Sequence, residues 1–320
     1  MKRIKRVFSC VILVSLAISL CSCSSSRMNI QPSGGGVGTA PKTGAVSDAS
    51  GAQIPRTALP SGISAPESES AVETDMPPTS QSINPYEEIT ECNLADAAGD
   101  VSVAVHDYKS GYSIAGSDKK MKSASVIKLF VMEYAFSLID KGEITADTLI
   151  NGRSLAELME LMITVSDNNA TNTLIEHFGM DKLNAYFAFA GYTGTVLGRK
   201  MLDFDALAKG KDNYTTSNDV MKFMDRLYAS KDRGSSKQML SIMKRQKVAT
   251  KIRRDIPGDA EIANKTGELS DVENDVGIIF TPNGDCALVV LINNVTSPQS
   301  ARDAIAATAS DIFDFLKNGQ

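Results

Sequence analysis

Short stretches of alternating apolar and polar residues lie near both ends of the region that runs from residue 100 to the C-terminus. Val101, Val103 and Val105 alternate with smaller or polar residues, and a second short run at 112–115 follows a Lys-Ser-Gly turn. This period of two predicts a β-hairpin. Two further apolar runs, at 276–280 and 287–292, are separated by the turn sequence Pro-Asn-Gly-Asp and predict two more strands.

Between these strands, apolar residues recur at helical spacing. The clearest case is the segment 125–139, where Ile127, Phe130, Val131, Tyr134 and Leu138 fall on one side of a helix. Further helices are predicted at 155–163, 170–178 and 182–190, and a glycine follows each of the last two. A short helix at 86–98 and a longer one from Pro298 to Leu316 bracket the whole region.

Strands at both ends with helices between them predict an α+β fold. We expect one antiparallel sheet that is assembled from distant segments and flanked by the terminal helices, with an all-helical subdomain inserted into it. This arrangement is assigned to one domain, residues 86–320.

The N-terminal part of the chain has a different character. A basic start at 2–6 and an apolar stretch at 7–20 predict a signal peptide that ends at residue 23. Its end, Leu20-Cys21-Ser22-Cys23, resembles a bacterial lipobox with Cys23 as the lipidated residue; an ordinary secretory signal is the alternative. Residues 24–85 are rich in Ser, Gly and Pro, which predicts a disordered tether. We therefore expect an extracytoplasmic protein with a lipid anchor in the membrane.

Composition excludes several classes of function. The net charge is −5 and no basic patch is visible, so nucleic acid is not an expected partner. His106 and His177 are the only histidines, and a lone histidine in a strand or helix is more often a packed or surface residue than a base. No spacing of zinc ligands is present. Cys92 and Cys286 remain in the folded part, and their spacing leaves a disulfide open.

Ser125 and Lys128 form the first of three motifs. Their i, i+3 spacing places both on one face of a helical turn, where a desolvated lysine can accept the proton of a serine nucleophile. The Ser125 N–H at the helix start can also help to bind an oxyanion. The alternative is a helix-capping serine beside a surface lysine, because S-x-x-K is common by chance.

The second and third motifs follow in order along the chain. In Ser166-Asp167-Asn168, the hydroxyl could relay a proton and the Asn168 amide could hold a carbonyl; a helix cap is the alternative. In Lys265-Thr266-Gly267, which is expected just before the last two strands, the lysine offers charge to a carboxylate and the glycine offers room for an extended substrate. The alternative there is a turn with an exposed lysine.

As an ordered set, S-x-x-K, S-D-N and K-T-G resemble the class A β-lactamase-type serine hydrolases, over essentially everything after Asp100. The resemblance implies that Ser125 is the acylated nucleophile, Lys128 its proton acceptor and Ser166 the proton shuttle. It also implies that Asn168, Lys265, Thr266 and Gly267 bind substrate, and that the N–H groups of Ser125 and Glu268 form the oxyanion hole.

The chain departs from this family at three places. The glutamate that deacylates class A enzymes is absent from 199–216, where Asp205, and next Asp203, are the nearest substitutes by position. No aromatic residue between 137 and 165 matches the gate of the family. The strand arginine appears as Val276, which leaves Arg302 at the start of the last helix as the expected carboxylate clamp.

Three functions follow from this pattern. The first is a β-lactamase that works through a Ser125 acyl-enzyme without cofactor or metal, as a monomer. The second is a DD-peptidase-like hydrolase of cell-wall peptides. The third is a sensor or binding module that deacylates slowly.

Overall fold

The computed structural model describes residues 84–319. The predicted signal peptide, the lipobox and all but the last two residues of the predicted tether lie outside the described residues. Within the described residues, no helix combines the length and the apolar character that crossing a membrane requires.

Five antiparallel strands form the central sheet, in the spatial order β2-β1-β9-β8-β7. The strands are β1 (Asp100–Asp107), β2 (Ser113–Ile114), β7 (Glu261–Leu269), β8 (Val272–Thr281) and β9 (Gly284–Asn293). The predicted hairpin is confirmed, with Val105 opposite Ile114, and β1 pairs along its whole length with β9. Two ends of the folded chain therefore meet in the middle of one sheet.

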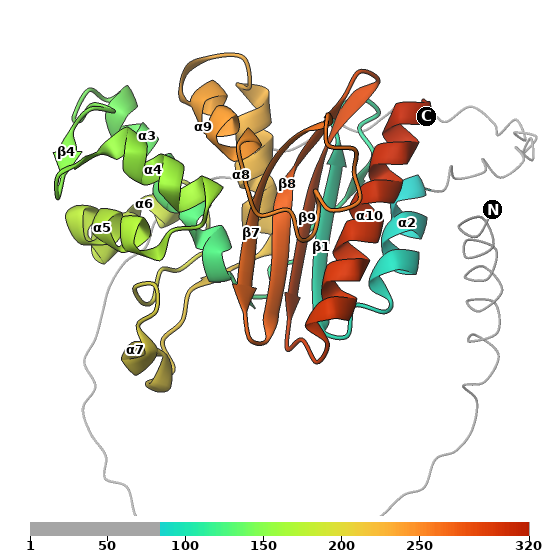
Figure 1. Ribbon diagram of the computed structural model, residues 1–320, viewed down its shortest axis with the longest axis horizontal. Coiled ribbons are helices and arrows are strands. Elements are labelled where there is room, and N and C mark those ends of the chain that lie inside the picture. Colours follow the sequence, from blue (N-terminus) through green and yellow to red (C-terminus); the bar gives the residue numbers. More distant parts are fainter. Residues whose placement is uncertain (1–83, 320) are drawn as a thin grey trace, which may run out of the picture. The chain divides into compact units, whose positions relative to one another are not determined.

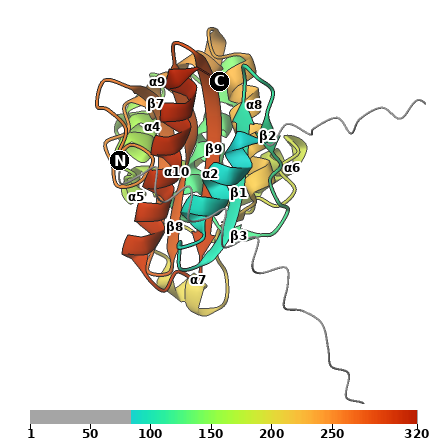
Figure 2. The ribbon, with the colours of Figure 1, turned by 90° about the vertical axis from the view of Figure 1, so that its right-hand side faces the viewer.

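Helices cover both faces of this sheet (Figures 1 and 2). α10 (Pro298–Asn318) lies with α2 (Pro85–Leu94) against one face, and the other helices lie on the opposite side. That helical layer comprises α3 (Ile127–Asp140), α4 (Leu155–Thr164), α5 (Asn168–Phe178), α6 (Met180–Phe189), α7 (Phe204–Ala208), α8 (Ser217–Ala229) and α9 (Gly234–Lys244). The predicted α+β architecture is confirmed.

Alternation along β9 divides the interior into two cores. Ala287, Val289 and Leu291 face the helical layer, while Leu288, Val290 and Ile292 face α10 and α2. A strand with both faces buried reads as a continuous apolar run, and this explains why β9 is easily predicted.

Several predicted details need correction. α3 begins at Ile127, because a 3-10 turn, η1 (Ala124–Val126), precedes it and contains Ser125. Lys265-Thr266-Gly267 precedes the last two strands as predicted, but it lies within a further strand, β7, at the edge of the sheet. The disulfide that the sequence left open is absent, because Cys286 is a buried free thiol in the core beneath α10.

Two small two-stranded ladders complete the fold. β3 (Met121–Lys122) pairs with β6 (Tyr214–Thr215), and β4 (Leu149–Ile150) pairs with β5 (Arg153–Ser154). The first ladder joins the segment before η1 to the end of the long loop 191–216, so that loop is fixed beside Ser125.

Gly267 allows β7 to approach η1 closely. A Cβ added at Gly267 would lie 2.9 Å from the Ser123 carbonyl oxygen and 3.2 Å from the Ser125 nitrogen. Both are backbone atoms, which cannot move aside without shifting the turn that carries Ser125.

We expect Gly267→Ala to destabilise the protein by about 1–3 kcal/mol, the usual cost of overpacking. Gly258→Ala is the matched control, because a Cβ there meets no atom within 4 Å. Urea denaturation of both variants measures the difference. Equal stability of the two variants would contradict the close approach.

Candidate active site

Ser125 is half-buried on η1, in a turn that the sheet and the long loop hold on two sides. Asn274 of β8 donates from Nδ2 to the carbonyls of Lys122 and Ser123, at 3.0 and 3.2 Å. The Ser123 N–H donates to the Asn213 carbonyl at 2.9 Å. Ala124 adopts φ of 46°, a left-handed conformation that a non-glycine residue rarely takes. Such strain is retained where the surroundings fix the backbone.

Lys128 lies in the first turn of α3 and its side chain is fully buried. Nζ donates to the Ser166 carbonyl at 2.8 Å, to Ser166 Oγ at 3.2 Å and to Asn168 Oδ1 at 2.8 Å. Burial lowers the pKa of Lys128 to about 7, although the charge of Asp167 opposes this shift. The amine is therefore able to accept a proton near neutral pH.

Lys265 reaches the same point from β7 and is also fully buried. Its Nζ donates to Ser166 Oγ at 3.0 Å and to the Thr266 carbonyl at 2.8 Å. Burial, followed by the charge of Lys128, holds the pKa of Lys265 well below its usual value. The three sequence motifs thus converge on one hydroxyl oxygen.

The Ser166 hydroxyl can accept two hydrogen bonds and donate one. With both lysines donating to Oγ, its own proton is directed elsewhere. Ser166 has φ of 56° and is, like Ala124, a non-glycine residue in the left-handed region. Asp167 accepts a hydrogen bond from the Ala170 N–H at 2.6 Å and caps α5. The motif therefore supplies a helix cap at Asp167, while its two neighbours contact Lys128 and their expected roles toward substrate stay predictions.

The end of β7 carries charged side chains in close contact. Lys251 is fully buried and donates to Glu268 at 2.5 Å and Glu273 at 2.9 Å. Arg302 of α10 binds Glu273 through Nε at 2.8 Å and Nη2 at 2.7 Å. The guanidinium of Arg302 is therefore paired with a carboxylate of the protein itself. Its expected role as a clamp for a substrate carboxylate stays a prediction. Sequence reasoning missed Lys251, which no motif marks.

The long loop 191–216 is joined to α5 at Met201. Asn172, one turn after Asn168 on α5, binds the Met201 backbone on both sides: it accepts from the N–H at 2.8 Å and donates to the carbonyl at 3.0 Å. The Met201 side chain is buried in the helical core. Sequence reasoning also missed this residue, because the contact joins a side chain and a backbone far apart in the chain.

The carboxylates expected to replace the missing glutamate lie further along the same loop. Asp203 caps α7 by accepting from the Ala206 N–H at 2.9 Å, and Asp205 is exposed in the first turn of α7. Figure 1 shows α7 on a projecting loop, apart from α3–α6. Among the described residues, no hydrogen bond or ion pair connects Asp205 to Ser125, Lys128 or Ser166. The base role expected of Asp205 thus has no support from its contacts.

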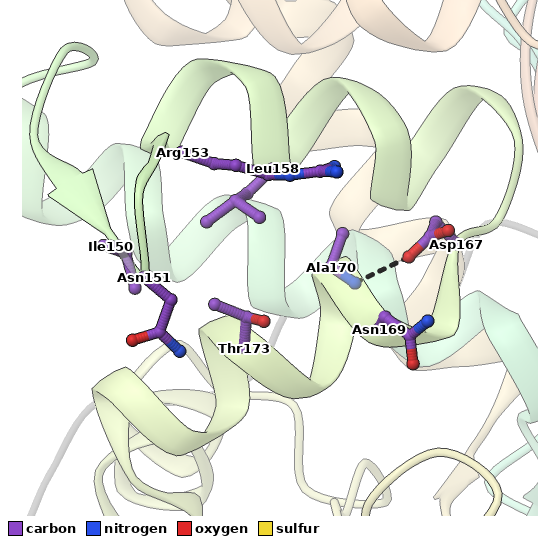
Figure 3. A pocket seen from close by; sticks show the side chains of 8 residues that line it. All are labelled: Ile150, Asn151, Arg153, Leu158, Asp167, Asn169, Ala170 and Thr173. Carbon is purple, nitrogen blue, oxygen red and sulfur yellow. Dashed lines mark hydrogen bonds between the residues drawn. The ribbon is translucent and has the colours of Figure 1, made fainter.

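A small pocket of about 230 Å³ lies beside the Ser166 loop, between β4, β5 and the helices α4 and α5 (Figure 3). In Figure 3 the Arg153 side chain extends over Leu158 toward Asp167, and Asn151 and Asn169 lie on the other side. No aromatic residue lines the pocket. The pocket thus has a mixed polar and apolar lining, which includes Asp167 and Asn169 on either side of Asn168 in the chain.

The histidines lie elsewhere: His106 on β1 binds Asp225 through Nδ1 at 2.7 Å, and His177 is exposed. In residues 84–319, no group of three or more His, Cys, Asp and Glu side chains could hold a metal ion.

Known proteins are similar to this chain in sequence and in fold. A β-lactamase of Amycolatopsis lactamdurans is 26% identical over 185 residues, which cover 55% of this chain and 60% of that protein. Among solved structures, a β-lactamase from Chitinophaga pinensis gives a TM-score of 0.67 at 20% identity, covering 72% of this chain and 99% of that one. A variant of PBP-A, solved as an acyl-enzyme complex with penicillin G, gives 0.63 at 24% identity over 72% and 95%. The structural similarities at this identity show a shared fold.

The model of the beta-lactamase enzyme family matches residues 84–316, almost all of the described region. With this match and the three motifs brought together at Ser166, the chain belongs to the beta-lactamase enzyme family.

Proposed function

We propose that this protein is a serine hydrolase of the class A type, which opens β-lactam rings by forming an acyl-enzyme at Ser125. The observation that carries the proposal is the position of Ser166 Oγ, 3.2 Å from Lys128 Nζ and 3.0 Å from Lys265 Nζ. This arrangement serves acyl transfer because it links a base, a relay and a substrate-binding cation in one network.

Acylation then proceeds through residues already in place. Ser125 Oγ attacks the lactam carbonyl and passes its proton to the neutral amine of Lys128. The Ser166 hydroxyl gives its proton to the departing lactam nitrogen and takes one from Lys128. The N–H groups of Ser125 and Glu268 stabilise the oxyanion. Lys265 and Thr266 contact a carboxylate or carbonyl of the substrate.

A second candidate function is a protein that is acylated but releases the acyl group slowly. Met201 favours it, because its backbone is bonded to Asn172 of α5 and its buried thioether cannot activate water. We also propose, from the sequence pattern alone, that Cys23 anchors the protein outside the cytoplasm.

We expect a fluorescent penicillin to label the purified protein and Ser125→Ala to abolish the label, because only a covalent nucleophile leaves an adduct. Gel fluorescence measures this. Ser137→Ala is the control, because Ser137 lies near the end of α3 and bonds to the Tyr134 carbonyl and to Tyr186. A labelled Ser125→Ala protein would contradict the proposal.

We expect the acylation rate to fall below neutral pH. The pKa of Lys128 is lowered to about 7, so the neutral amine dominates above pH 7 and is lost as the pH falls. The second-order labelling rate should therefore fall about tenfold for each pH unit below 7 and level off above it. A rate that is constant between pH 5 and 8 would exclude Lys128 as the base.

We expect a burst of one equivalent of ring opening followed by slow turnover. Asp205→Asn should leave the slow phase unchanged because Asp205 is exposed, whereas Met201→Glu should accelerate it at least about tenfold, since a positioned base contributes a factor of that order or more. Hydrolysis of a chromogenic cephalosporin measures both phases. A slower steady state in Asp205→Asn would instead identify Asp205 as the base.

A further inference from the structure

Four charged side chains form a cluster at the end of β7, which we call the rim cluster: Lys251, Glu268, Glu273 and Arg302. Lys251 donates to Glu268 Oε1 at 2.5 Å and to Glu273 Oε2 at 2.9 Å. Arg302 binds Glu273 Oε1 and lies 3.9 Å from Glu268 Oε2. Two cations therefore face two carboxylates.

The rim cluster borders the active site directly. Glu268 follows Gly267, whose added Cβ would lie 3.2 Å from the Ser125 nitrogen. The charges of Lys251 and Glu268 both act on Lys265, with opposite effects on its pKa. A change of charge in the rim cluster would thus alter the electrostatic potential at Lys265, where the substrate is expected to bind.

The four members differ in exposure. The side chains of Lys251 and Glu273 are 0% and 2% exposed, so this inner pair is fixed within the protein. Glu268 and Arg302 are 38% and 34% exposed, and Arg302 is held by Glu273. Glu268 is therefore the member that can lose its charge while the other three remain paired.

We propose that Glu268 is a specificity-determining residue, which cancels the positive charge of Lys251 and Arg302 and so disfavours acyl donors with a free carboxylate beside the scissile bond. This inference rests on the proposed function and refines its substrate class: Glu268 reduces the advantage that a carboxylate beside Lys265 and Thr266 would otherwise have over an uncharged group. A carboxylate arriving there meets two cations and two carboxylates, whose charges sum to zero, whereas without Glu268 the cluster would be positively charged. Coulomb attraction between a carboxylate and such a cluster acts over several ångströms near a protein surface.

The test compares two probes that differ only in charge: benzylpenicillin and its methyl ester. Second-order acylation rate constants are measured by mass spectrometry for the full protein and for Glu268→Gln. We expect Glu268→Gln to raise the rate with benzylpenicillin about fivefold, while the rate with the ester stays within about twofold. At 1 M salt the gain should diminish, because charge is screened.

Two further variants serve as controls for the position and the charge of the substituted residue. Glu261→Gln makes the same charge change at the opposite end of β7 and should leave the ratio of the two rates unchanged. Glu268→Asp keeps the charge and should retain the ratio of the unmodified protein. Thermal unfolding verifies that each variant is folded.

An unchanged ratio in Glu268→Gln would overturn the proposal, as would an equal loss with both probes, which would indicate a purely structural role. A Glu268→Asp variant that behaves like Glu268→Gln would overturn it as well. Failure of the unmodified protein to react with either probe would contradict the proposed function itself.

Discussion

Two buried lysine amines donate to one hydroxyl oxygen, and the rest of the structure must supply the other acceptors that these amines need. Removing an ammonium from water is costly, and a second one nearby adds repulsion. Both are tolerated because each amine meets several oxygen acceptors: Ser166 for both, Asn168 for Lys128 and the Thr266 carbonyl for Lys265. Those acceptors come from α5, its preceding loop and β7. The sheet and the helical layer must therefore keep the relative position that brings these acceptors to the two amines.

Some backbone conformations near these groups are strained. Ala124 and Ser166 take left-handed conformations, and Gly267 lets β7 pass close to η1. These features help to hold the three motifs in place. The loop 191–216 is attached differently, because it is bonded to α5 through the Met201 backbone and through the ion pair between Lys200 and Glu176. The convergence of the motifs and the attachment of this loop thus depend on separate contacts.

Local patterns explain which elements could be predicted from the sequence. β9 and α3 are recognisable because their apolar residues follow the period of a strand or a helix. The spacing of Val220, Phe223, Met224 and Leu227 would have allowed α8 to be predicted in the same way. β7 lacks such a pattern, because polar residues such as Asn264, Lys265 and Thr266 are buried in it and bonded to other elements.

The residues of the candidate site differ in the same way: local sequence patterns mark some of them and not others. Serine and lysine in the three motifs are recognisable because their spacing is short and their order is fixed. Lys251, its contact with Glu273 and the position of Met201 depend on side chains that meet only after folding. Arg302 shows the limit of prediction from the sequence. Its position at the start of α10 is predictable, but its pairing with Glu273 depends on a strand 29 residues away in the chain.

One consequence concerns how such an enzyme could change over time. The neck of the loop 191–216 is closed by a buried ion pair between Arg199 and Asp212, at 2.8 Å, while Leu202, Phe204 and Leu207 beyond it are exposed. Residues past a closed neck can be replaced with little effect on the core, because they have few neighbours to disturb. The loop tip is thus a region in which selection can try new side chains while the stability of the fold is preserved.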